Sequence, residues 1–163
     1  MNQEKKKITL ISSESTPVGI NAKALGRSKF IKDFLKDFPE DSIRLGTINY
    51  KTLLKIKEYL EHYENEDPKE IERPLTSQNF KECVDEWDFK YIDVELELIF
   101  ELILGANYMD IKNLLELASA KVASIIKGKN TEEIRKIFNI QNDFTPEEEQ
   151  QILEENKWCM ENL

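Results

Sequence analysis

The chain has 163 residues, of which 40% are hydrophobic and 34% are charged, and its formal net charge at pH 7 is −9. An acidic chain repels the phosphates of nucleic acids and of anionic lipids, and no apolar run approaches the ~18 residues that span a bilayer, so we expect no nucleic acid and no membrane as partner. Because the start lacks the apolar run of a secretory signal, we expect a cytoplasmic and nuclear protein.

The residue types that carry catalysis or bind metals are sparse. Cys83 and Cys159 are the two cysteines, and neither belongs to a CxxC or a Cys/His group with the spacing of metal ligands. The single histidine, His62, has no Ser or Cys motif beside it, which favours a surface residue over a catalytic base. The glutamates around Cys159 disfavour a reactive thiolate. We therefore expect no enzyme, no metal and no cofactor.

Two short β-type runs open the chain, at 8–12 and 16–20, and the Ser-Glu-Ser turn between them predicts a hairpin. Pro17 places the second strand at an edge of the sheet, because proline donates no hydrogen bond to a neighbouring strand. A third, brief strand is expected at 43–45.

Apolar residues at helical spacing predict a helix from the Ser28 cap to Pro39, with its apolar face turned inward, and another from the Asn49 cap to about His62. Residues 64–78 are acidic and rich in proline, which predicts a mobile surface loop. The next segment, 80–91, shows no clean period, so we expect a short helix or an irregular stretch.

Two strongly apolar helices follow. Residues 96–104 are apolar on nearly every side, which predicts a central buried helix that ends near Gly105. The next helix is expected to begin at Asp110, to keep an apolar stripe and to stop at Gly128. Two or three strands with a cluster of helices predict an α+β domain over residues 1–128.

Residues 129–163 are expected to form a C-terminal helical extension. Asn130 with Glu133, and Thr145 followed by Pro146, have the spacing of two helix N-caps. From Asn130 on, nine acidic side chains stand against three basic ones, yet large apolar residues recur among them. Isolated helices shorter than ~12 to 15 residues are marginal in water. Either the extension folds back as an ordinary subdomain, or a partner covers its apolar side chains.

The run from Phe100 to Cys159 resembles the S-phase kinase-associated adaptor family, the linker between F-box proteins and a cullin in SCF ubiquitin ligases. The shared segments are ANYMDIK, IKGK, EEIRK, FNIQNDFT and an N-x-W-C near the end. Nearer the N-terminus only ITLISSES and WDFKYIDVE look similar, and the lengths between them differ. The resemblance implies a BTB/POZ-like fold with a short three-stranded sheet, and a non-catalytic adaptor in ubiquitin-dependent protein degradation.

The resemblance also assigns residues to two binding surfaces. The residues expected to face the cullin are Asn107, Tyr108, Met109 and Phe100. The residues expected to bind F-box proteins are Val122, Ile126, Ile134, Phe138, Ile140, Phe144 and Trp158. From the residues alone, the Asn-Tyr pair also fits a plain helix corner, and the stripe around Val122 fits plain core. Pro146 matches a proline that is hydroxylated and glycosylated in some protist members, although it also suits a helix start.

Two other functions remain open at this point. BTB/POZ folds often form homodimers, so the chain could be a self-associating scaffold, or a homodimer when F-box protein is absent. It could also be an elongin-C-like adaptor for another class of receptor. Proteins of that kind lack the C-terminal extension, and the segment from NTEEIRK to NKWC supplies one here.

Overall fold

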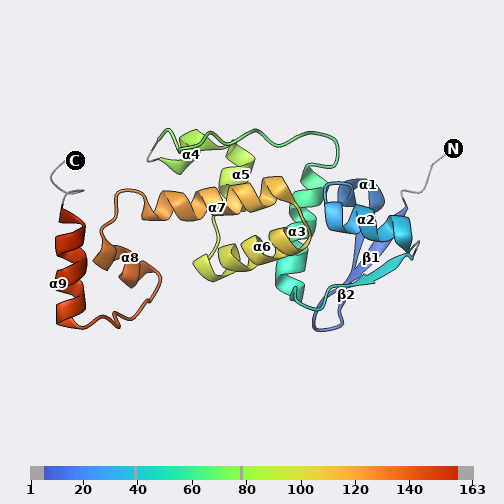
Figure 1. The fold of residues 1–163 in the computed structure, drawn as a ribbon. Coiled ribbons are helices and arrows are strands. Elements are labelled where there is room, and N and C mark those ends of the chain that lie inside the picture. Colours follow the sequence, from blue (N-terminus) through green and yellow to red (C-terminus); the bar gives the residue numbers. More distant parts are fainter. Residues whose placement is uncertain (1–5, 39, 78, 158–163) are drawn as a thin grey trace. The chain divides into compact units, whose positions relative to one another are not determined.

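The computed structural model describes residues 6–38, 40–77 and 79–157. Its contacts divide the chain into two compact units, Met1–Lys127 and Gly128–Leu163, called here the N-terminal and the C-terminal unit (Figure 1). The N-terminal unit contains a three-stranded sheet and most of the helices, so the class is α+β, as predicted. Among the described residues, no helix is both long and apolar enough to cross a membrane.

The sheet has the order β2-β1-β3 and is built from Lys7–Ile11 (β1), Pro17–Asn21 (β2) and Ser42–Arg44 (β3). The first two strands form the predicted antiparallel hairpin, and Pro17 lies in an edge strand, as expected. The third strand begins one residue earlier than predicted and runs parallel to β1. Leu10 of the central strand is fully buried, so the middle of the sheet is part of the core.

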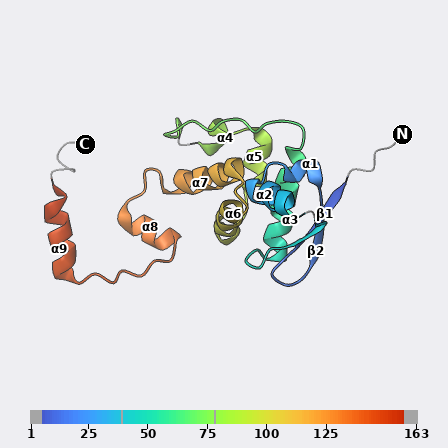
Figure 2. The ribbon, with the colours of Figure 1, turned by 45° about the vertical axis from the view of Figure 1, so that its right-hand side comes forward.

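Two helices, Ala22–Leu25 (α1) and Lys29–Asp37 (α2), lie between the hairpin and the third strand, and Tyr50–His62 (α3) follows that strand. The sequence did not predict α1. The two predicted caps are confirmed, because the side chain of Ser28 accepts a hydrogen bond from the Ile31 amide and that of Asn49 accepts one from the Thr52 amide. Helix α3 packs against both β2 and the next long helix, so it joins the sheet to the helical part of the unit (Figure 2).

The two apolar helices are Leu96–Tyr108 (α6) and Lys112–Ile126 (α7), and they pack side by side. The predicted end of α6 near Gly105 is wrong, because the helix continues for another turn. The predicted start of α7 is also wrong: Asp110 has a φ of 48°, outside the helical region, and lies in the corner between the helices. Gly128, with a φ of 74°, follows α7 and provides the predicted stop.

Gly105 allows α6 to approach α3 closely. A Cβ atom added there would lie 2.8 Å from Cδ1 of Ile56. We therefore expect Gly105→Leu to lower the free energy of unfolding by about 1–3 kcal/mol, the usual cost of overpacking a core, as measured by denaturant titration. Glu97→Leu, an exposed change on the same helix, is the control and should leave stability nearly unchanged. Equal stability of both variants would contradict a tight contact between α3 and α6.

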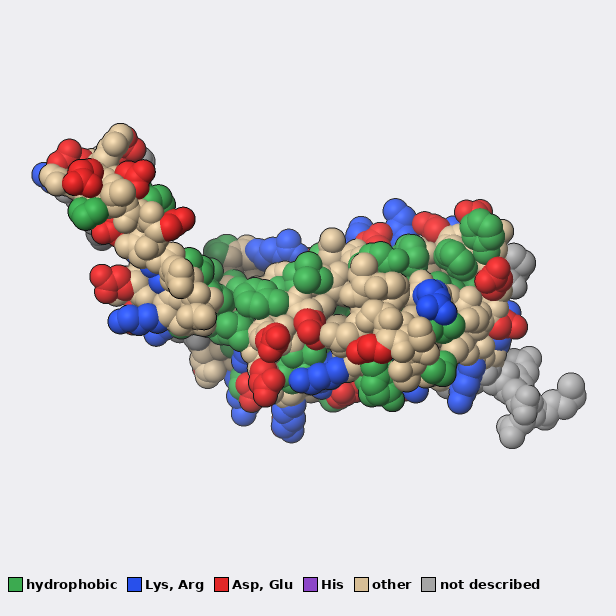
Figure 3. Space-filling model, turned by 90° about the horizontal axis from the view of Figure 1, so that it is seen from below, with side chains coloured by type: hydrophobic (Ala, Val, Ile, Leu, Met, Phe, Trp, Pro, Cys, Tyr) green, Lys and Arg blue, Asp and Glu red, His purple; other side chains and the backbone are tan. Residues whose placement is uncertain are grey.

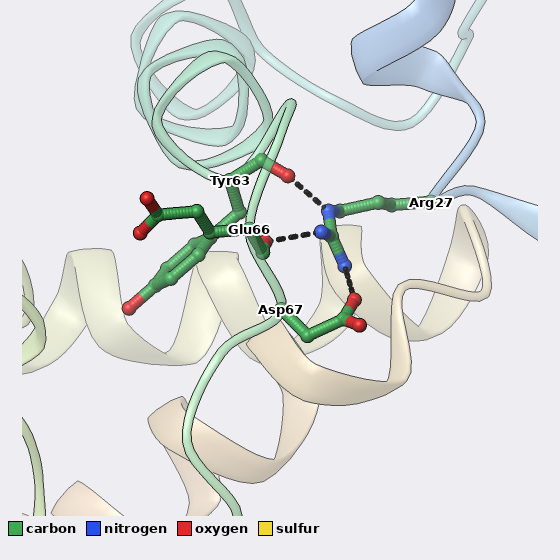
Figure 4. A network of polar contacts seen from close by, with 4 residues as sticks. All are labelled: Arg27, Tyr63, Glu66 and Asp67. Carbon is green, nitrogen blue, oxygen red and sulfur yellow. Dashed lines mark hydrogen bonds and ion pairs between the residues drawn. The ribbon is translucent and has the colours of Figure 1, made fainter.

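Residues 64–77, called here the strap, connect α3 to two short helices, Phe80–Cys83 (α4) and Glu86–Tyr91 (α5). The strap has no helix or strand, and Lys127 holds its far end by hydrogen bonds to the carbonyls of Leu75 and Ser77. At its start, the Arg27 guanidinium donates to the carbonyls of Tyr63 and Glu66 and pairs with Asp67 at 3.0 Å (Figure 4). The predicted mobility of this segment stays a prediction.

Aromatic rings join α3 to α5 around a buried carboxyl. Asp88 is only 3% exposed, and its Oδ1 atom has no hydrogen-bond partner among the described residues. Burial raises the pKa of Asp88, while a hydrogen bond from the Tyr63 hydroxyl opposes that shift. The rings of Tyr59 and Trp87 lie close to each other and complete the apolar surroundings. The ionised form of Asp88 is therefore disfavoured in the folded protein.

This buried carboxyl makes stability depend on pH. The unfolded chain loses the Asp88 proton near the ordinary aspartate pKa of about 3.9, whereas the folded protein holds it to a higher pH, so stability falls as pH rises through that interval. Asp88→Asn cannot ionise. We expect the free energy of unfolding of this variant at pH 7 to exceed that of the wild type by on the order of 1 kcal/mol. The difference should disappear toward pH 4, as measured by denaturant titration.

Glu86→Gln is the matched control on the same helix. A hydrogen bond from Lys90 lowers the pKa of Glu86, so this variant should lose stability relative to the wild type above the ordinary glutamate pKa, the opposite direction to Asp88→Asn. A difference between Asp88→Asn and the wild type that is independent of pH would contradict the assignment.

Candidate functional site

One face of α6 exposes large apolar side chains in a row. Phe100, Leu104 and Tyr108 recur every fourth residue, so they lie on the same side of the helix, and they are 40%, 70% and 39% exposed. Asn107 is exposed beside them. In Figure 1 α6 lies below α7, and in Figure 3, which shows the molecule from below, hydrophobic side chains gather near the middle of the face. This row and Asn107, together called here the α6 face, include three of the four residues expected to face the cullin.

The row continues onto α2. The ring of Phe30 lies 5.2 Å from that of Tyr108, and Phe34 and Phe38 follow along the helix. The prediction that the apolar side of α2 faces inward is confirmed for Ile31, which is buried, and for Phe30, Phe34 and Leu35, which pack partly buried against the core. Phe38, which follows the helix, is exposed. The sequence analysis did not assign these phenylalanines to a binding surface. Their spacing of four residues was the available signal, but a buried stripe has the same spacing.

Met109 does not belong to this surface as a contact residue. It is fully buried, and its carbonyl accepts a 2.5 Å hydrogen bond from the hydroxyl of Ser28. It therefore fixes the start of α2 against the corner between α6 and α7. We correct the expected set of contacts accordingly: Met109 supports the α6 face from beneath.

A polar contact secures the helix that carries this face. The Thr52 hydroxyl donates a 2.5 Å hydrogen bond to the carboxylate of Glu101, and this bond lowers the pKa of Glu101. Because Glu101 follows Phe100 directly, the contact holds this turn of α6 against α3. The apolar row is thus displayed on a helix fixed by its neighbours.

The C-terminal unit has two helices, Thr131–Ile137 (α8) and Pro146–Glu155 (α9). Both predicted caps are confirmed as full capping boxes, in which Asn130 exchanges hydrogen bonds with Glu133, and Thr145 with Glu148. Pro146 occupies the first position of α9, where no amide hydrogen is needed.

Arg135 of α8 contacts both α9 and the segment between the two helices. Its guanidinium lies 3.5 Å from the Glu149 carboxylate and over the ring of Phe144, at 5.9 Å from the centroid. Its backbone carbonyl accepts a hydrogen bond from the amide of Ile140. One side chain therefore positions Phe144 between the two helices.

No residue of the described part of this unit, 128–157, is buried. Ile140 and Phe144 are 54% and 47% exposed, while Ile134 and Phe138 are half-buried. Leu153 is 58% exposed and Ile152 is also exposed, although the expected contact set omitted both. Trp158 lies outside the described residues. Residues 128–157 therefore form no core of their own and present apolar side chains outward.

Two further expected contacts lie on α7 of the N-terminal unit. Val122 is partly buried and packs against the core, and Ile126 is 37% exposed. Ile126 can therefore contact a partner directly, whereas most of Val122 serves packing. Val122 therefore fits the interpretation of this stripe as core, while the interface role of Ile126 stays a prediction.

Among the described residues, no three His, Cys, Asp or Glu side chains are grouped so that they could hold a metal ion. His62 is exposed and stacks on Trp87, with the ring centroids 3.6 Å apart. Both units expose large apolar side chains, on helices α6 and α9 and, at Ile140 and Phe144, in the segment between α8 and α9. Such an arrangement is suited to binding other proteins.

Comparison with known proteins shows which family and which relatives the chain resembles. Residues 112–159 match the family described as Skp1 family, dimerisation domain. The chain is 50% identical over 163 residues to the S-phase kinase-associated protein 1 homolog of Tetrahymena thermophila, covering 99% of this chain and 98% of that protein. It is 45% identical over 157 residues to the E3 ubiquitin ligase complex SCF subunit sconC of Arthroderma benhamiae, covering 95% and 96% of the two chains. The sconC subunit of Talaromyces marneffei is 44% identical over 154 residues, or 93% and 96% of the two chains.

Proposed function

Because the chain belongs to the Skp1 family, we infer that it is an adaptor subunit of an SCF E3 ubiquitin ligase complex. The observation that carries this conclusion is the 50% identity to the Tetrahymena relative along nearly the full length of both proteins. The identity spans the α6 face and the C-terminal unit together. The partners that follow from the role are a cullin and F-box proteins.

We propose that the two partners bind to different parts of the chain. The α6 face, with Phe100, Leu104, Asn107 and Tyr108, is the cullin surface. F-box proteins bind the exposed apolar residues of the C-terminal unit, and Ile126 of α7 is a further contact on the N-terminal unit. Support comes from their exposure and from the helices that fix them: α6 is held by α3, and α8 and α9 are linked through Arg135.

In this function the chain makes and breaks no covalent bond. One surface binds the subunit that carries the substrate, and the other binds the scaffold of the ligase. Joining two binding events raises the effective concentration of one partner near the other, to the millimolar range for short linkers. The net charge of −9 disfavours nonspecific contacts with acidic partners. We further propose that the protein acts in the cytoplasm and the nucleus, which imaging of a tagged chain would test.

The function is tested by reconstitution. The cullin and one F-box protein, identified by affinity purification of the tagged chain from its own cells, are purified and mixed with and without it. Light scattering after size exclusion should show a complex of all three, and no association of cullin with F-box protein when the chain is omitted. A homodimer that binds neither partner would instead favour the self-associating scaffold.

The absence of catalysis is a separate proposal with its own test. Incubation with an E2 enzyme charged with ubiquitin should leave no reducible adduct on the chain. An adduct that disappears when Cys83 or Cys159 is replaced by serine would contradict it. Whether Pro146 is modified is tested by the intact mass of protein from its native source, where hydroxylation adds one oxygen atom.

A further inference from the structure

A groove lies within the N-terminal unit, between α7 and the strap, which runs alongside that helix in Figures 1 and 2. Its volume is about 750 Å³, within the usual range of sites for small molecules. Apolar side chains form most of both walls: Leu115, Ala120 and Ala123 on α7, and Ile71, Pro74 and Leu75 on the strap. Water makes few hydrogen bonds to such walls, so an apolar group that displaces it is favoured.

Polar contacts fix the strap beside the helix. Arg73 of the strap pairs with Glu116 of α7, and Lys127 holds the far end of the strap. Between these contacts α7 presents the small side chains of Ser119, Ala120 and Ala123, so the wall is recessed there. The groove is therefore formed before any ligand arrives, which lowers the entropic cost of binding.

The charges around the groove favour an anionic ligand. Lys112 and Lys127 both line it, and neither makes an ion pair with a residue that the structure describes. Of the acidic residues there, Glu116 is already paired with Arg73, which leaves the two lysines against Glu72. Such a basic rim is unusual in a chain whose net charge is −9, and it attracts negative charge.

The positions of these residues along α7 indicate the shape of the ligand. Lys112 is the first residue of the helix, and Ala123 lies three turns further along it, about 16 Å away at the helical rise of ~1.5 Å per residue. Leu115, Ser119 and Ala123 line the groove between those points. A flexible, unbranched alkyl chain can follow this recess while a charged head group stays at Lys112. A single carboxylate matches the single charge of that lysine.

We propose that the groove binds a long-chain fatty acid, with its alkyl chain between α7 and the strap and its carboxylate paired with Lys112. None of the residues that line the groove was assigned above to the cullin or to F-box proteins. The inference therefore goes beyond the adaptor role and does not depend on it. Because the ligand contacts both walls, its binding stabilises the folded N-terminal unit.

The first test concerns the carboxylate. Dodecanoate, kept below the concentration at which it forms micelles, is titrated into the full chain by calorimetry and should bind at a saturable site. We expect Lys112→Gln to weaken the affinity at least fivefold. Lys32→Gln, which changes an exposed lysine of α2, is the control and should alter it less than twofold. Dodecanol, which has the same alkyl chain without the charge, should bind the wild type and Lys112→Gln equally.

The second test fills the groove. Ser119→Trp places an indole in it and should weaken dodecanoate binding at least tenfold. Asn113→Trp, an exposed position of the same helix that does not line the groove, should change it less than twofold. Dodecanoate should raise the melting temperature of the wild type and of Asn113→Trp, but not that of Ser119→Trp.

Two results would overturn the proposal. One is the absence of saturable dodecanoate binding by the wild type. The other is binding that Lys112→Gln leaves unchanged, which would indicate adsorption to exposed apolar side chains elsewhere. If Ser119→Trp does not fold, the comparison of Lys112→Gln with Lys32→Gln still decides, because both lysines are exposed. Either outcome leaves the binding of cullin and F-box proteins to its own tests.

Discussion

Replacing Leu104 and Tyr108 together by alanine is expected to weaken cullin binding on the order of 100-fold and to leave F-box binding unchanged. Exposed apolar and aromatic side chains at the centre of an interface each lose about 1–2 kcal/mol or more when truncated, and about 1.4 kcal/mol is a tenfold change in affinity. Leu104 is 70% exposed, so its removal costs the fold little. The dissociation constants are measured by calorimetry with the purified cullin N-terminal region and the F-box domain.

A crossed control uses the same chemical change in the other unit. Leu153→Ala removes an equally large side chain that is 58% exposed on α9. It should weaken F-box binding and spare the cullin, the reverse of the Leu104 variant. If both variants weaken both partners equally, the two surfaces are not separate. If Asn107→Ala alone also weakens cullin binding, the side-chain amide of Asn107 belongs to the cullin surface as well.

Deletion of residues 145–163 is expected to abolish F-box binding, a loss of at least 100-fold, while the cullin still binds with wild-type affinity. The deletion removes α9 with Ile152 and Leu153, neither of which is buried. Because the described part of the C-terminal unit has no buried residue, the N-terminal core stays intact without α9. Thermal unfolding of the truncated chain should therefore match that of the full chain.

Point variants show whether the deletion acts through the apolar surface. The double change Ile152→Asp and Leu153→Asp should reproduce most of the loss, since a charge buried at an interface without a partner is strongly unfavourable. Gln150→Asp, an exposed polar position of the same helix, should have little effect. F-box binding that survives both the deletion and the double change would remove the C-terminal unit from the interface.

Local signals in the sequence predicted the features that depend on a few neighbouring residues. The caps at Ser28, Asn49, Asn130 and Thr145 are all present, because each is a contact between a side chain and a backbone amide three residues away. The hairpin and the edge position of Pro17 follow from equally local rules. The class and the separate C-terminal helices could therefore be predicted.

Features that depend on distant contacts were missed. The continuation of α6 beyond Gly105 is stabilised by packing against α3, and nothing within the helix itself signals this contact. Met109 was expected at an interface and is buried instead, since an apolar residue at helical spacing fits a core and an interface equally well. The contacts of the strap join residues about 40 positions apart, such as Arg27 and Asp67, which no local pattern predicts.

The fastening of the strap at both ends has a practical consequence. Arg27 holds its start, and Lys127 holds its far end. Because the entropy of closing a loop rises slowly with its length, extra residues inserted between Pro68 and Lys69 should bulge into solvent while the anchors stay in place. A fluorescent domain carried at this junction would report on assembly of the ligase in living cells, with neither chain terminus altered.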